Sequence, residues 1–147
     1  MAITTFKSNV KVQEGFTLKC DNNNGNHVIF DEPEAMGGKD LGMNPCEGLL
    51  SSLGACQTMA GKAFAKARGI NLNDIWVEVE GDIDLSGFMG AEGVKVGFQE
   101  IRSTIHISAD NTEEEIQDFV RFIERTCPVG DTINNPAKIV AIPNILK

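Results

Sequence analysis

The sequence contains no tyrosine, a single tryptophan and no dense cluster of basic residues. With so few aromatic side chains, the core must be built mainly from Ile, Val, Leu, Met and Phe. Lysine and arginine number 13 against 21 acidic residues, which gives a formal net charge of −8. A chain with this balance repels the phosphates of nucleic acids. We therefore expect no nucleic-acid partner.

Several sequence motifs and segments are also missing. No segment reaches the roughly 18 apolar residues that a membrane span needs, and residues 1–7 lack the charged and apolar regions of a signal peptide. We therefore expect a cytoplasmic protein without a membrane partner, whose cysteines stay reduced unless they are catalytic, redox-active or metal-bound. The four cysteines form no Cys-x-x-Cys pair and there is no His-rich tract, so no metal site is expected.

The pattern of apolar residues predicts strands and helices within one domain. The 147 residues are enough to bury a core, and no repeat or linker divides them, so we predict a single domain over residues 1–147. Alternating apolar segments between turn residues predict strands. These are residues 3–11, 16–20, 27–30, 75–85, 98–108 and 138–145.

Two predicted helices complete the order of elements. The first covers residues 44–68, and the second opens at a capping box of Thr112 and Glu115 and ends at Cys127. The order β-β-β-α-β-β-α-β, with strands in antiparallel pairs, is typical of the α+β class.

The first predicted helix is long and lined with small residues. Asn44 provides an N-cap and Pro45 the first helical position, and its length corresponds to roughly 37 Å at 1.5 Å per residue. Interior glycines such as Gly54 and Gly61 each cost up to about 1 kcal/mol relative to alanine, so some contact must offset them. We expect close helix–helix approach, with this helix buried at the centre of a dimer.

Two cysteines are candidates for chemistry. A reactive thiolate needs a nearby positive charge, a helix N-terminus or hydrogen-bond donors. Cys56 lies in the middle of the long helix, and by itself it is more typical of an inert core cysteine. Cys127 lies at a helix boundary beside Arg125, and both a reactive role and simple packing fit it. Cys46 lies too far along the same helix, about 15 Å, to form a disulfide with Cys56.

The remaining candidates are weaker. Cys20 lies in a strand–turn context and is expected to be structural. His27 and His106 lie in predicted strands without an acidic partner at motif spacing, so each is expected to be a surface or core histidine.

Residues 42–56, GMNPCEGLLSSLGAC, resemble the central-helix motif of the OsmC/Ohr superfamily, the osmotically inducible and organic-hydroperoxide-resistance proteins. Cys56 follows Pro45 at the spacing of that motif, and Cys127-Pro128 resembles the second cysteine motif of the family. Asp31-Glu-Pro and Gly37-Gly also fit. The resemblance extends over essentially the whole chain.

The resemblance implies an intertwined homodimer, in which curved antiparallel sheets wrap around paired central helices. It also implies an oxidative-stress peroxidase without metal or organic cofactor. The cysteine matching Cys56 is oxidised by an organic hydroperoxide to a sulfenic acid. The cysteine matching Cys127 condenses with it to a disulfide, which a dithiol reductant then reduces.

The sequence departs from the peroxidase members in two places. They carry an activating arginine near the N-terminus, whereas the first arginine here is Arg68. They also carry a glutamate directly after the helix proline, whereas Cys46 stands there and Glu47 follows, as in a divergent redox-protein branch of the superfamily. On an ideal helix Glu47 lies about 180° around from Cys56. The predicted site residues are therefore Cys56, Cys127 and Glu47, with a lysine or Arg125 supplying positive charge.

Three hypotheses stay open on the sequence. The first is a hydroperoxide reductase that uses Cys56 and Cys127. The second is a non-peroxidase dimer of the same fold that binds a small hydrophobic or thiol ligand at its interface pocket, because fold alone does not fix function. The third is a structural dimer whose thiols are unreactive.

Overall fold

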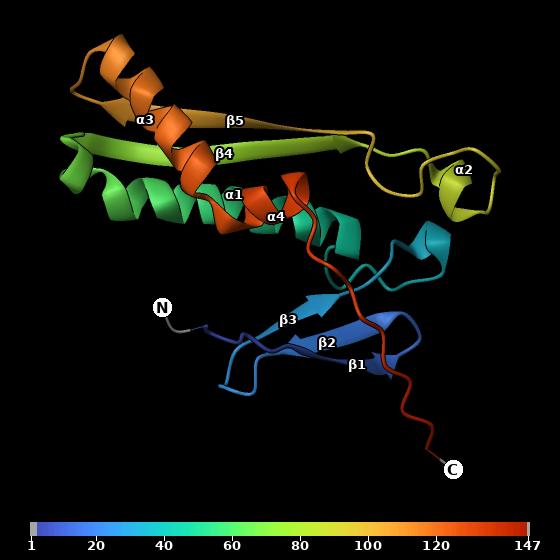
Figure 1. The fold of residues 1–147 in the computed structure, drawn as a ribbon. Coiled ribbons are helices and arrows are strands. Elements are labelled where there is room, and N and C mark those ends of the chain that lie inside the picture. Colours follow the sequence, from blue (N-terminus) through green and yellow to red (C-terminus); the bar gives the residue numbers. More distant parts are fainter. Residues whose placement is uncertain (1–2, 147) are drawn as a thin grey trace. The chain divides into compact units, whose positions relative to one another are not determined.

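The structure is a computed structural model that describes residues 3–146. Its internal contacts separate into two compact units, Met1–Ser51 and Ser52–Lys147, which are described in turn (Figure 1). The long helix α1 (Pro45–Phe64) runs through the boundary between them. The prediction of one domain over residues 1–147 stays a prediction.

The first unit contains a three-stranded antiparallel meander. Its strands β1 (Asn9–Glu14), β2 (Thr17–Asp21) and β3 (His27–Phe30) pair in sequence order. The turns before β2 and β3 contain Gly15 and Gly25, which both have positive φ, a conformation that glycine adopts without steric cost. The predicted meander is confirmed, although its first strand starts at Asn9 rather than at residue 3.

The loop after β3 is organised by a buried carboxylate. Asp31 is only 2% exposed, and it accepts hydrogen bonds from the Thr17 hydroxyl at 3.0 Å and from the backbone N–H groups of Glu32, Lys39 and Leu41. Burial raises the pKa of this carboxyl, but these hydrogen bonds outweigh it, so the pKa lies below its ordinary value. The loop also contains the short 3₁₀ helix η1 (Glu34–Met36).

The helix α1 is shorter than predicted. It ends at Phe64 and is followed by a 3₁₀ turn, η2 (Lys66–Arg68), before Gly69 in the left-handed conformation. Helical structure therefore continues to Arg68, as predicted, but its last turn is a 3₁₀ helix and not an α-helix. Such tightening is common at helix C-termini.

The second unit is built on a two-stranded antiparallel hairpin. Strands β4 (Leu72–Asp82) and β5 (Glu100–Ala109) pair along their length, and the connection contains the short helix α2 (Leu85–Phe88). Helix α3 (Glu113–Thr126) opens at the predicted capping box, which is confirmed. A further helix, α4 (Pro128–Asn134), follows directly, and the sequence reasoning missed it.

The predicted strand at residues 138–145 is wrong for this structure. No strand is assigned there, and Ile139 and Ile142 are 92% and 84% exposed. A β-strand needs a neighbouring strand for its backbone hydrogen bonds, and no described part of the chain supplies one to this segment.

The core of the second unit lies between α1, the hairpin and α3. Its buried members are Ala65, Ile70, Ile75, Phe119 and Ile123. Residues 52–64 of α1 run along the hairpin (Figure 1). A Cβ added at Gly61 would overlap the Cδ1 atom of Ile75, and one at Gly54 would come within 3.2 Å of Val79.

These contacts correct the expectation that helix–helix approach explains Gly54 and Gly61. Both glycines face strand β4, so they let α1 lie close against a sheet. The cost of an interior glycine is offset by helix–sheet packing within one chain.

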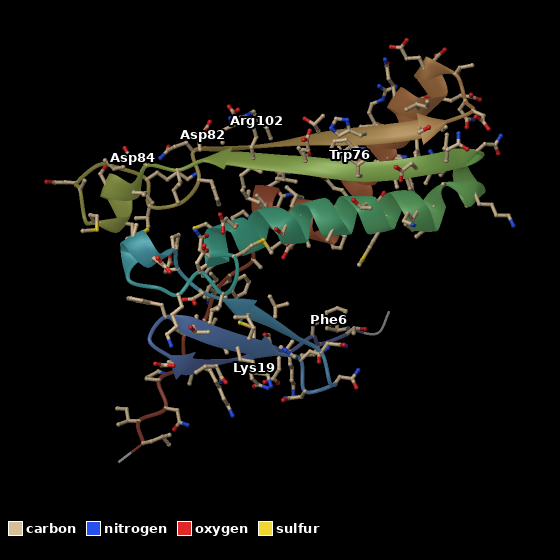
Figure 2. All side chains as sticks on the ribbon, turned by 180° about the vertical axis from the view of Figure 1, so that it is seen from behind. Phe6, Lys19, Trp76, Asp82, Asp84 and Arg102 are labelled. Carbon is tan, nitrogen blue, oxygen red and sulfur yellow. The ribbon has the colours of Figure 1, made fainter. Side chains whose placement is uncertain are left out.

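The outer face of the hairpin is charged (Figure 2). Arg102 forms ion pairs with Glu80, Asp82 and Glu100. His106 stacks on Trp76 with 3.7 Å between ring centroids and lies 2.9 Å from a carboxylate oxygen of Glu78. The sequence offered no acidic partner at motif spacing, and Glu78 comes instead from the neighbouring strand, because cross-strand pairing brings together residues that no linear motif connects.

Within residues 3–146, no helix is both long enough and apolar enough to cross a membrane.

Candidate active site

Cys127 directly follows α3 and lies in line with the buried residues on one face of that helix. Phe119 and Ile123 precede it at four-residue spacing, and all three side chains face the core, with Cys127 fully buried. The residue ends α3 and caps α4, because its Sγ atom accepts a hydrogen bond from the Gly130 N–H at 3.3 Å.

The surroundings of Cys127 keep its thiol protonated. Burial raises the pKa of the Cys127 thiol, and a hydrogen bond with Cys56 raises it further, while the N–H groups of Gly130 and Val129 oppose this. The net shift is upward, as expected when a thiol is withdrawn from water. A thiol with a raised pKa is a poor source of thiolate at neutral pH.

Cys56 lies on α1 next to Cys127. It is half-buried, and it is the neighbouring group that, after burial, most raises the pKa of the Cys127 thiol. All four cysteines are free. The structure therefore brings together the two cysteines that the sequence singled out, in their reduced state.

Cys56 also lines an open pocket of about 510 Å³. The other lining residues are small or apolar, and they come from α1 and from the junction of α3 and α4. They are Ser52, Ala55, Met59, Ala60, Ala63, Phe64, Thr126 and Pro128. This pocket, here called the Cys56 pocket, gives a hydrophobic small molecule access to one thiol of the pair.

The positive charge expected near Cys56 is not among these lining residues. Arg125, a candidate from the sequence, lies over the Phe122 ring at 5.4 Å from its centroid. Arg68 lies over the same ring at 4.4 Å. Both guanidinium groups are thus engaged with an aromatic face, a favourable contact for a cation.

Glu47 forms a capping box at the start of α1. Its carboxylate accepts the Asn44 N–H at 2.9 Å, and its own N–H donates to the Asn44 side-chain oxygen at 3.0 Å. The side chain is exposed. Glu47 and the exposed Cys46 belong to the first unit, as does the half-buried Cys20.

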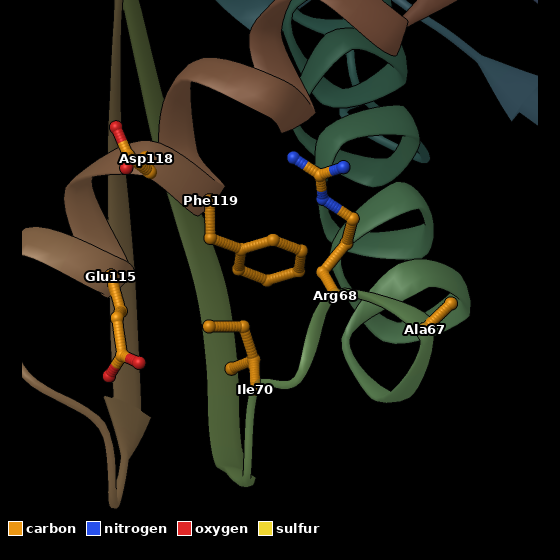
Figure 3. A pocket seen from close by; sticks show the side chains of 6 residues that line it. All are labelled: Ala67, Arg68, Ile70, Glu115, Asp118 and Phe119. Carbon is orange, nitrogen blue, oxygen red and sulfur yellow. The ribbon is translucent and has the colours of Figure 1, made fainter.

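A separate pocket of about 310 Å³ lies between residues 67–70, which follow α1, and helix α3 (Figure 3). Its charged side chains already have partners. Glu115 completes the Thr112 capping box, and Asp118 pairs with Arg121. This pocket is therefore a weaker candidate than the one at Cys56. Among residues 3–146, no three His, Cys, Asp or Glu side chains lie together as a metal site would need.

Sequence reasoning missed two residues beside the thiol pair. Gly130 supplies the N–H that binds Cys127, and Gln57 is 5% exposed although it carries a polar amide. The available signal was the amide itself, which follows Cys56 in a helix otherwise rich in small and apolar residues. Gly130 gave no signal, because the helix α4 that places it was not predicted.

Comparison with known proteins identifies the family to which the chain belongs. The family described as OsmC-like protein matches residues 37–141. A protein of Mycoplasma genitalium named hydroperoxide reductase is 29% identical over 99 residues, covering 65% of each chain. This is just under two thirds of that relative's length. A protein of Mycoplasma pneumoniae with the same name is 28% identical over 104 residues, 71% of each chain.

The fold is shared with a solved structure. The crystal structure of an OsmC-like protein from Mycoplasma pneumoniae superimposes with a TM-score of 0.79 at 22% identity, covering 90% of this chain and 89% of that one. The resemblance that the two cysteine motifs carry is thus confirmed by the family match and by the fold. The chain belongs to the OsmC-like protein family.

Proposed function

We propose that this protein is a thiol-dependent hydroperoxide reductase, in which Cys56 attacks the peroxide and Cys127 resolves the product to a disulfide. The observation that carries the proposal is the pairing of the two thiols, with Cys56 opening into an apolar pocket and Cys127 buried behind it. The names of the two Mycoplasma relatives support the same reaction class.

The first step consumes the hydroperoxide. The Cys56 thiolate attacks the terminal oxygen of the O–O bond, which breaks, and the leaving alkoxide takes up a proton as an alcohol. Sulfur is oxidised by two electrons to a sulfenic acid. The apolar lining of the Cys56 pocket suits the carbon skeleton of an organic hydroperoxide better than hydrogen peroxide, which cannot use those contacts.

The second step forms the disulfide. The Cys127 sulfur, as thiolate, attacks the sulfenic sulfur of Cys56, an S–S bond forms, and hydroxide leaves and is protonated to water. The two thiols need no large movement for this, because Cys56 lies close enough to Cys127 to raise the pKa of its thiol. A dithiol reductant then returns both cysteines to the thiol state by two exchange steps.

A second copy of the chain is proposed to complete the site. The C-terminal segment exposes apolar side chains that monomeric proteins usually cover, including Ile139, Ile142 and Leu146 at 92%, 84% and 87% exposure. We propose that it joins the sheet of a partner in an intertwined homodimer. A cation from the partner would then activate Cys56, oriented by Glu47. A cytoplasmic location and a single domain over residues 1–147 belong to the same proposal.

Consumption of cumene hydroperoxide with a dithiol reductant tests the proposal. Cys56→Ser should abolish turnover, because the oxygen of serine is not oxidised by the peroxide. Cys46→Ser is the matched control, an exposed cysteine on the same helix, and should retain full turnover. Equal activity of the Cys56→Ser variant and the unsubstituted protein would refute the proposed chemistry.

One observation favours the second hypothesis, a non-peroxidase dimer that binds a small hydrophobic or thiol ligand. The residues that line the Cys56 pocket include no charged side chain, and under this hypothesis the pocket would bind apolar molecules without activating the thiolate. A protein that consumes no peroxide, yet binds a hydrophobic thiol saturably beside Cys56, would establish this alternative.

A further inference from the structure

The turn that joins β2 to β3 is made almost entirely of asparagine (Figure 1). It covers residues 22–26, all of which are exposed, and only Gly25 among them is not asparagine. The backbone N–H of Asn22 donates to the carbonyl of Asn26 at 3.2 Å and closes the turn. Asn24 is the only asparagine in the sequence that directly precedes a glycine.

An asparagine side chain can react with the backbone nitrogen of the residue that follows it. This nitrogen attacks the side-chain Cγ atom, ammonia leaves, and a five-membered succinimide ring forms. A side chain on the following residue obstructs the approach, and glycine carries none. The attacking nitrogen must also give up its proton, so a hydrogen bond from that N–H group to an acceptor slows the reaction.

Hydrogen bonds in the turn protect two of the asparagines but not Asn24. The N–H group that could attack Asn22 belongs to Asn23, and it donates to Asp21 Oδ1 at 3.2 Å. The N–H group that could attack Asn23 belongs to Asn24, and it donates to Asn22 Oδ1 at 2.9 Å. The N–H group of Gly25 has no acceptor among residues 3–146, and open space surrounds the position that a Cβ of this residue would take.

We propose that Asn24 is a site of spontaneous modification, at which the folded protein converts asparagine to isoaspartate. The Gly25 nitrogen forms a bond to Cγ of Asn24 and releases its proton, while the bond from Cγ to the amide nitrogen breaks and ammonia leaves. Water then opens the succinimide at one of its two carbonyl carbons. Opening at one carbon gives isoaspartate and opening at the other gives aspartate, and either product adds one negative charge to the chain.

Isoaspartate changes the turn itself, because its main chain runs through the former side chain. One extra carbon atom then lies within the loop that the hydrogen bond between Asn22 and Asn26 closes. The Asn22 side chain also accepts the N–H groups of Asn24 and Asn26, so these bonds must rearrange as well. The thiols take no part in this reaction, so the proposal does not depend on the proposed function.

The test is ageing of the full-length protein in mildly alkaline buffer. Digestion at acidic pH then stops the reaction, and mass spectrometry with fragmentation that distinguishes isoaspartate from aspartate locates the product. Isoaspartate should accumulate at Asn24 at least several-fold faster than at Asn22 or Asn23, because each of those reactions first requires a hydrogen bond to break. The rate should rise with pH, because the attacking nitrogen must lose its proton.

Three controls separate the effect of the fold from that of the sequence. Asn24→Ser removes the reactive amide and should leave no isoaspartate at that position. In guanidinium chloride the protecting hydrogen bonds are lost, so the preference for Asn24 over Asn22 and Asn23 should shrink. Asn22→Ala removes the acceptor of the Asn24 N–H group, and it should raise the rate at Asn23 several-fold.

The proposal is overturned if the folded protein forms no isoaspartate at Asn24 during an exposure in which the unfolded chain does. It is also overturned if Asn22 or Asn23 reacts as fast as Asn24 in the folded protein. A preference for Asn24 that is no greater in the folded protein than in guanidinium chloride would likewise contradict it, because the protecting hydrogen bonds would then have no effect.

Discussion

The Cys127 thiol is fully buried beside Cys56, which reaches an open apolar pocket. The two sulfur atoms therefore have unequal access to solvent, with the attacking role assigned to the accessible one. The proposed roles, attack by Cys56 and resolution by Cys127, follow from the positions of the two helices. Helix α1 places Cys56 at the pocket, whereas Cys127 follows the buried face of α3.

The resolving step should be slow at neutral pH and faster in mild alkali. Burial raises the pKa of the Cys127 thiol, so its reactive thiolate is scarce until the pH approaches that raised value. The Cys56 sulfenic acid should therefore live longer at neutral than at alkaline pH, which trapping with dimedone and mass spectrometry would measure. Cys127→Ser should prolong that lifetime at both pH values. A lifetime in the unsubstituted protein that does not depend on pH would contradict this prediction.

The same shift affects stability. A thiol whose pKa is raised by folding loses its proton first in the unfolded chain, so the free energy of unfolding should fall as the pH rises from the ordinary to the raised pKa. Urea denaturation across this range should show that fall, and Cys127→Ser should lose the part of it that comes from this thiol.

Glu47 allows its cap and its charge to be tested separately. Glu47→Gln keeps an acceptor for the Asn44 N–H and removes the charge, so it should leave the melting temperature nearly unchanged. If the carboxylate orients an activating cation as proposed, the same variant should lower peroxide turnover several-fold. Asn44→Ala is the complementary control, because it removes the cap and should cost about 1 kcal/mol of stability. If Glu47→Gln kept the full peroxide turnover of the unsubstituted protein, Glu47 would have only its capping role.

A side chain at Gly61 should destabilise the fold. A Cβ there would overlap Ile75 and lie 3.3 Å from Ile123, and overpacking of this kind costs about 1 to 3 kcal/mol. The higher helix propensity of alanine offsets up to about 1 kcal/mol of this loss in the free energy of unfolding. Urea denaturation of Gly61→Ala should therefore show a net loss, whereas Gly130→Ala, where the added atom makes only ordinary contacts at 3.6 Å, should be nearly neutral. Equal stability of the two variants would argue against close helix–sheet packing at Gly61.

Local signals in the sequence predicted the elements that local chemistry determines. The Thr112 capping box, the N-cap at Asn44 and the glycine turns of the meander all appear where expected. The contact that Gly54 and Gly61 make was not predictable, because a small helix residue permits close approach by either a helix or a strand. The Lys138 to Ile145 segment has the apolar residues of a strand, but within the described chain these residues are exposed and no strand pairs with the segment.

In the candidate site, too, the residues within motifs were predictable from the sequence, whereas the contacts between distant residues were not. Cys56 and Cys127 were found because each lies in a motif, whereas their proximity depends on how α1 and α3 pack on one hairpin. Gln57 and Ser103 meet across the fold, from α1 and β5, and no linear pattern connects them. The buried role of Asp31 was also hidden, because its four donors come from β2 and from its own loop.

The central claim is that Cys56 and Cys127 form a peroxide-driven disulfide. The most direct measurement is the intact mass after one equivalent of cumene hydroperoxide, followed by peptide mapping without reduction. The account predicts a rapid loss of two hydrogen atoms per chain and a single cross-linked peptide that joins Cys56 to Cys127. Thiols that stay unchanged after prolonged exposure, or a cross-link through Cys20 or Cys46, would contradict it.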